Sequence, residues 1–257
     1  MARRATIIKQ NRSQNPNTLL LDAGNSLYMN DQNSKEPTEA NQGQTGVEVL
    51  NRLGYDAVGL GDQDLALGKA ELQKRVAEAK GFTFVSANLI DKGTGKLFVK
   101  PYVVKEVGGH RVALIGITGI PAQESPDFTV LAPLDAARDY VQRVRSEADI
   151  IILLSTAGAQ TNQTLASQVP GIDIVLSGGS EALTEPVSPV PGTLVAQADM
   201  SSPGHAGRYI GQLQADFDRT GALVKNSWRS VELGPSVADD PEIKAWVDSL
   251  ATPTPAS

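Results

Sequence analysis

The segment formed by residues 54–64 restricts the fold of this 257-residue chain more than any other. Residues 56–60 predict a short buried strand that is entered from a Gly-Tyr turn, and two glycines allow the backbone to leave the strand sharply. The polar stretch Asp62-Gln63-Asp64 follows the strand, and a helix is predicted over residues 69–79. In an open α/β sheet, ligands bind at the carboxyl ends of the strands. This strand, loop and helix therefore predict a unit that carries a functional site.

The same alternation of strand and helix continues up to residue 176 and then changes. Further strands are predicted at residues 18–22, 82–87, 149–154 and 172–176, further helices at 2–14, 45–53, 134–148 and 161–169, and a hairpin at 102–107 and 111–117. Three strands, at 193–198, 209–217 and 223–231, then follow without helices between them, before a last helix at 241–250. This order predicts two mixed sheets packed face to face with helices outside, a four-layer α/β/β/α sandwich. We expect a single domain over residues 1–250 and a Thr/Pro tail over 251–257.

Composition narrows the classes of function. The net charge is −6 and the pI is near 5.0, which disfavours a nucleic-acid partner. The adjacent basic pairs Arg3-Arg4 and Lys74-Arg75 are interpreted as solvated helix faces. The chain has no cysteine, so disulfides, thiol catalysis and Cys-zinc sites are excluded. No apolar run approaches the ~18 residues of a membrane span, and no signal peptide is recognised at the start of the chain.

Five sequence blocks, in order, resemble the metallophosphoesterase domain of the 5′-nucleotidase/UDP-sugar hydrolase (calcineurin-like) family. Residues 54–64 are similar to the family's Gly-Tyr-Asp-Ala-Val-x-Leu-Gly-Asn-His-Glu/Asp, and residues 17–25 contain a block that is similar to its Leu-Leu-Asp-Ala-Gly-Asp. Residues 86–88 match its Ser-Ala-Asn, and residues 154–158 resemble Leu-Ser-His-x-Gly. Residues 173–181 resemble Asp-x-Ile-x-x-Gly-His-Ser-His. The resemblance covers nearly the whole chain and implies the sandwich of metallo-dependent phosphatases.

The resemblance also implies that the family's ligand positions have changed. The family uses His, Asn and a bridging Asp at these places, and this chain carries other residues there: Asn25, Asp62, Gln63, Thr156, Gly179 and Glu181. Two adjacent divalent ions require several imidazoles and a bridging carboxylate. The family's opening strand, which ends in Asp-x-His, has no counterpart here and is expected to be missing. We therefore expect a degenerate pocket, with Asp64 and His205 as candidates for its rim, and neither a bound metal nor another cofactor.

The main interpretation from the sequence is a pseudoenzyme. It predicts a catalytically inactive binding, scaffold or accessory subunit with an unidentified protein partner. The expected location is extracytoplasmic, in the periplasm or at the surface of a bacterial cell, with the targeting segment absent from this chain. The alternative is a phosphoester hydrolase with a remodelled site, in which Asp62, Asp64 and Glu181 hold calcium or magnesium. His110 is interpreted as a solvated residue of a hairpin turn.

Overall fold

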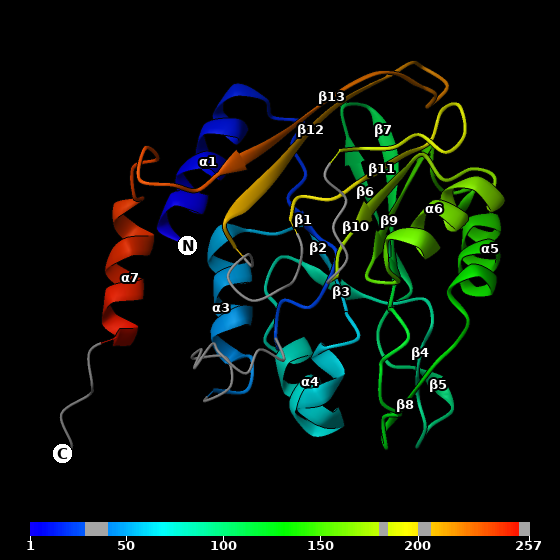
Figure 1. Ribbon diagram of the computed structural model, residues 1–257, viewed down its shortest axis with the longest axis horizontal. Helices are drawn as coiled ribbons and strands as arrows, with labels where there is room; N and C mark the ends of the chain where they lie inside the picture. Colours follow the sequence, from blue (N-terminus) through cyan, green and yellow to red (C-terminus); the bar gives the residue numbers. More distant parts are fainter. Residues whose placement is uncertain (29–40, 180–184, 200–206, 252–257) are drawn as a thin grey trace.

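The computed structural model describes residues 1–28, 41–179, 185–199 and 207–251. Figure 1 shows four layers, with α3 and α4 on one outside, two sheets in the middle, and α5 and α6 on the other outside. The predicted four-layer sandwich is therefore confirmed, but the first of its two sheets is wholly parallel and not mixed as predicted. The order of the predicted helices and strands is also confirmed, and the first helix has the predicted bounds, Ala2–Gln14.

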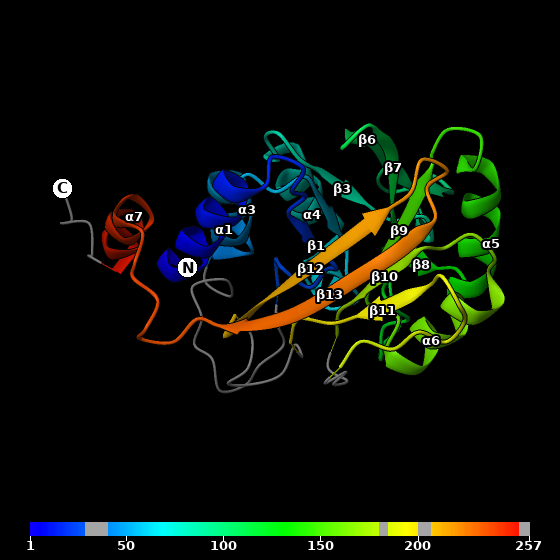
Figure 2. The same cartoon turned by 90° about the horizontal axis from the view of Figure 1, so that it is seen from above.

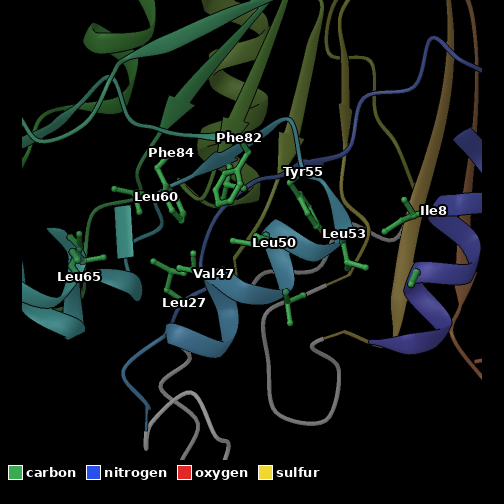
Figure 3. Close-up of a cluster of buried hydrophobic side chains, with 14 of the residues drawn as sticks. Ile8, Leu27, Val47, Leu50, Leu53, Tyr55, Leu60, Leu65, Phe82 and Phe84 are labelled. Carbon is green, nitrogen blue, oxygen red and sulfur yellow. The ribbon is translucent and has the colours of Figure 1, made fainter. Parts of the chain in front are cut away.

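The first sheet contains three short parallel strands in the order β1-β2-β3. The strands are β1 (Leu21–Asp22), β2 (Ala57–Gly59) and β3 (Thr83–Val85), and the helices on this side are α1 (Ala2–Gln14), α3 (Gln44–Leu53) and α4 (Gly68–Ala77). Helix α3 ends at Leu53 and is capped by Gly54, whose φ of 69° is left-handed, and Tyr55 then enters the core. Figure 3 shows Tyr55 beside Leu50 and Leu53 in the apolar cluster between helices and sheet. This cluster fixes where β2 begins.

The second sheet has five strands in the order β11-β10-β9-β7-β6. The strands are β6 (Tyr102–Val107), β7 (His110–Ile117), β9 (Ile150–Ser155), β10 (Ile174–Ser177) and β11 (Leu194–Ala196), and the covering helices are α5 (Pro133–Val144) and α6 (Ala159–Gln168). All pairs are parallel except the β6–β7 hairpin. Every residue of β9 is buried, as expected for a parallel strand covered on both faces.

Apolar side chains from both sheets meet in a common core. Ala57 and Val85 come from the first sheet, and Leu114 and Leu154 come from the second. This contact places the carboxyl ends of β1, β2, β7, β9 and β10 around one region of the molecule. The two sheets therefore contribute loops to a single site.

The end of the chain adds an antiparallel ribbon of β12 (Tyr209–Phe217) and β13 (Leu223–Glu232), followed by α7 (Pro241–Ala251). Figure 2 shows the ribbon running across the sandwich from beside α1. Leu213 and Phe217 of β12 pack against the core between the sheets.

Some sequence expectations are wrong. The prediction missed a small antiparallel sheet of β4 (Leu89–Asp91), β5 (Lys96–Leu97) and β8 (Phe128–Val130), and a short 3₁₀ helix, η1 (Asp64–Leu67). His110 is not a solvated turn residue, because it begins β7 and its ring lies 6.4 Å from that of Phe217.

The basic pairs are also less solvated than expected. Arg75 is only 6% exposed, and its guanidinium lies 3.2 Å from Glu78 and 3.6 Å from Glu71. Arg4 is half-buried and donates a 3.3 Å hydrogen bond to the carbonyl oxygen of Tyr209. Arg4 therefore joins α1 to β12, whereas the ion pairs of Arg75 lie within α4 and its C-cap.

Candidate active site

A pocket of about 330 Å³ lies where the carboxyl ends of the strands meet. Its lining residues come from the loops after β2, β7, β9 and β10, from the start of α5 and from the first turn of α6: Asp62, Gln63, Ile120, Pro133, Thr156, Ala157, Gly158, Thr161 and Gly179. Four of the predicted site residues, all but Asn25 and Glu181, are thus brought together. Glu181 and His205 lie outside the described residues.

Asn25 lies next to the pocket lining and is only 6% exposed. Its φ of 61° is left-handed, a conformation that Asn tolerates better than most residues. Its side-chain oxygen accepts a 2.9 Å hydrogen bond from the backbone N–H of Gln63, and its amide nitrogen donates one of 3.2 Å to Asp62. Asn25 therefore joins the loops that follow β1 and β2.

Asp64 is not a rim residue, because it is 1% exposed. Its two carboxylate oxygens accept four backbone N–H bonds of 2.9–3.2 Å, from Asn25, Leu27, Tyr28 and Gly61. Burial raises the pKa of Asp64 to about 7, although these N–H donors act in the opposite direction. Figure 3 shows Leu60 and Leu65, on either side of this loop, in the apolar cluster. Asp64 therefore organises the loops and does not face the pocket.

Thr156 connects the loops after β7 and β9. Its hydroxyl oxygen accepts a 3.0 Å hydrogen bond from the backbone N–H of Gly119. A Cβ on Gly119 would lie 2.4 Å from the carbonyl oxygen of Thr156, so only glycine permits this approach. Ile120 is consequently held at the pocket with 60% of its surface exposed.

The first turn of α6 forms another wall of the pocket through Gly158 and Thr161. The N-terminus of a helix carries a partial positive charge and backbone N–H groups that favour an anion. Gly179, with a φ of 108°, adds a wall without a side chain. The helix end therefore suits a small anionic group, whereas the negative charge of Asp62 on the facing wall suits a cation.

The metal centre that the resemblance implies does not fit the described residues. Asp62 is the only carboxylate among the described lining residues. Within the described parts of the chain, no group of three or more His, Cys, Asp and Glu side chains is placed to hold a metal ion. The amide oxygen of Asn25 is already bonded to Gln63, and Thr156 supplies only a hydroxyl. These donors lack the imidazoles and bridging carboxylate of a dinuclear transition-metal centre.

Sequence reasoning missed Ile120, Pro133 and Thr161 as lining residues. The signal for Ile120 was present, because it follows β7 at the same edge of the sheet as the predicted site loops. Thr161 was assigned to a helix, and only the direction of α6 toward the pocket reveals its role.

Comparison with known proteins identifies the class of this fold. No family model matches the chain. The 5′-nucleotidase precursor from Thermus thermophilus has a similar structure, with a TM-score of 0.79 and 26% identity over 98% of this chain and 52% of that chain. The calcineurin-like phosphoesterase YfkN from Bacillus subtilis also has a TM-score of 0.79, at 20% identity, over 98% of this chain and 88% of that one. The fold is that of the calcineurin-like phosphoesterases.

Curated relatives narrow this class. Snake venom 5′-nucleotidase from Gloydius brevicauda is 29% identical over 276 residues, which cover 97% of this chain and 45% of the relative. The metallophosphoesterase YunD from Bacillus subtilis is 29% identical over 246 residues, covering 93% of this chain and 51% of the relative. This chain is thus a homologue of 5′-nucleotidases and metallophosphoesterases, and it spans about half the length of the curated relatives it matches.

The interpretation of the chain as a catalytically inactive domain is wrong. The homologues are named as 5′-nucleotidases, which are enzymes, and substitutions at the resembling positions do not by themselves demonstrate a loss of activity.

No helix in the described ranges is long and apolar enough to cross a membrane.

Proposed function

We propose that this chain is the catalytic domain of a phosphoester hydrolase that cleaves phosphate monoesters, with nucleotides as the leading substrate class. The observation that carries the proposal is the pocket at the junction of the two sheets. Its walls come from the loops that resemble the site loops of 5′-nucleotidases, and the homology to those enzymes extends over nearly the whole chain. The names of the relatives supply the substrate class.

The described residues have distinct roles in this proposal. The phosphate lies against the first turn of α6, where Gly158 and Thr161 border the pocket. Asp62 faces it and would hold a single hard cation such as Mg²⁺, which would supply charge stabilisation to the phosphate, since Mg²⁺ is commonly bound by one or two carboxylates plus substrate. The exposed side chain of Ile120 contacts the organic part of the ester.

An assay of phosphate release tests the proposal. The purified protein is given nucleoside monophosphates and p-nitrophenyl phosphate, each with Mg²⁺, Ca²⁺, Mn²⁺ or Zn²⁺ and with a chelator. We expect turnover that depends on a divalent ion and stops in the chelator. If no ester is cleaved under any of these conditions, the proposed function is wrong.

We further propose that the chain acts outside the cytoplasm of a bacterial cell, in the periplasm or at the cell surface. The snake venom 5′-nucleotidases among the relatives support an extracytoplasmic location. The relatives from Bacillus subtilis and Thermus thermophilus support a bacterial origin of the chain. Fractionation of the native cells with an antibody to the chain tests this. An unidentified protein partner and the lack of a nucleic-acid partner stay predictions, the second supported by the net charge of −6.

A further inference from the structure

A chain of buried hydrogen bonds crosses the carboxyl ends of three neighbouring strands, and Asn162 is at its centre. The Ser155 hydroxyl on β9 donates a 2.6 Å hydrogen bond to the side-chain oxygen of Asn162. The side-chain nitrogen of Asn162 donates one of 2.9 Å to the hydroxyl of Ser177 on β10. Ser177 in turn donates one of 3.2 Å to Gln197, which directly follows β11. Asn162 and Ser155 are both 0% exposed.

The same series of hydrogen bonds continues to backbone groups of the loops that line the pocket. The Ser155 hydroxyl oxygen accepts a 3.2 Å hydrogen bond from the N–H of Ala157, and its carbonyl oxygen accepts one of 2.8 Å from the N–H of Gly178. The N–H of Asn162 donates a 2.9 Å bond to the carbonyl oxygen of Gly158. Each of these bonds fixes a residue that lines the pocket or adjoins one that does.

The donor and acceptor directions along this series of hydrogen bonds match the side chain of an asparagine. Ser155 needs an acceptor, because its own oxygen already accepts the N–H of Ala157. Ser177 needs a donor, because its hydroxyl hydrogen is directed to Gln197. The side-chain amide of Asn162 offers the acceptor on one side and the donor on the other. A buried group that loses its partner carries the full desolvation cost.

We propose that Asn162 is a positioning residue for the active-site pocket, which holds the loop after β9, the loop after β10 and the first turn of α6 in one arrangement. The inference rests on the proposed function, since positioning has a purpose only if the pocket binds a phosphoester. Asn162 itself does not line the pocket, so its effect passes through residues 156–158 and 178–179. The competing explanation is that the hydrogen-bond chain only stabilises the fold.

Two variants of Asn162 and one control separate these explanations. Asn162→Leu removes both the donor and the acceptor at similar size, and Asn162→Asp keeps the shape but loses the donor to Ser177. The control is Thr193→Val, which removes a buried 2.8 Å hydrogen bond to the carbonyl oxygen of Ile172 at the opposite ends of β10 and β11. Amide hydrogen exchange of residues 156–158 and 178–179 is measured, together with melting temperature and kcat/KM for p-nitrophenyl phosphate.

We expect exchange at Ala157 and Gly178 to become about 10-fold faster in the Asn162 variants, with no change at residues 86–88, which follow β3 of the first sheet. We expect kcat/KM to fall about 100-fold, because small displacements of a binding site have effects of this size. Thr193→Val lowers the melting temperature but leaves both readouts unchanged. If Asn162→Leu does not fold, Asn162→Asp gives the same comparison.

The inference is overturned if the Asn162 variants lose thermal stability as Thr193→Val does while exchange at Ala157 and Gly178 is unchanged. It is also overturned if kcat/KM is retained despite faster exchange. If the unmutated protein cleaves no ester, the proposed function fails, and the exchange rates still decide whether Asn162 positions the loops.

Discussion

The backbone N–H of Asn25 donates a 3.0 Å hydrogen bond to the carboxylate of Asp64, although the two residues lie on loops after different strands. Asp64 also accepts the N–H groups of Leu27, Tyr28 and Gly61. The buried side chain of Asp64 thus holds the loop after β1 against the loop after β2, which carries Asp62. The shape of the pocket depends on a carboxylate that does not face it.

Replacing Asp64 by asparagine should therefore destabilise the protein. Each carboxylate oxygen accepts two N–H groups, so the amide nitrogen of Asn would face two donors. We expect Asp64→Asn to lower the free energy of unfolding by about 3 kcal/mol, measured by urea unfolding at pH 8. Asp218→Asn is the matched control, because Asp218 accepts two backbone N–H groups in an exposed turn. Its free energy of unfolding should fall by less than that of Asp64→Asn. Equal losses for the two variants would contradict this account of Asp64.

Gly119 should not tolerate a side chain. A Cβ at this position would lie 2.4 Å from the carbonyl oxygen of Thr156, so the two loops would have to separate. We expect Gly119→Ala to lower the free energy of unfolding by about 2 kcal/mol, measured by thermal unfolding. In Gly234→Ala, a Cβ would meet only the side chain of Glu232, at 3.8 Å, and the melting temperature should stay as it is. A Gly119→Ala protein as stable as this control would show that the loops are less close than described.

Stability in acid should depend on Asp149. Hydrogen bonds from Arg111 hold the pKa of Asp149 at about 2, below its ordinary value of 3.8. Because the pKa is lower in the folded state, the stabilisation is present above about pH 4 and is lost as the pH falls toward 2. In urea unfolding over this range, Asp149→Asn should flatten the decline in the free energy of unfolding, and so should Arg111→Gln. A decline as steep as in the unmutated protein would exclude this pair as its source.

Much of the fold was predictable from the sequence, for reasons visible in particular segments. The apolar run of β9 is long and ends in a polar loop, so its burial and direction follow from the pattern. Strands β4, β5 and β8 were missed because they contain only two or three residues each, which is too short for a periodic signal. The burial of Arg75 was missed because a helical pattern does not show which neighbouring elements cover a cation.

The site was predictable only in part. The resemblance to the family's site loops predicted that Asp62, Gln63, Thr156 and Gly179 share one pocket, in agreement with the rule that ligands bind at the carboxyl ends of strands. The burial of Asp64 was not predictable, because its partners are backbone N–H groups from a distant loop. The expectation of inactivity was wrong because it equated altered ligand positions with lost chemistry.

The most direct test of the central claim is the rate of phosphate release by the unmutated protein, Asp62→Ala and Asp218→Ala, with the best ester and divalent ion. Asp62 faces the pocket, whereas Asp218 lies in the turn between β12 and β13. We predict measurable release by the unmutated protein and by Asp218→Ala, and a fall of about 100-fold or more in Asp62→Ala. Phosphate release that is absent from the unmutated protein, or equal in Asp62→Ala and Asp218→Ala, would contradict the claim that this pocket hydrolyses phosphoesters.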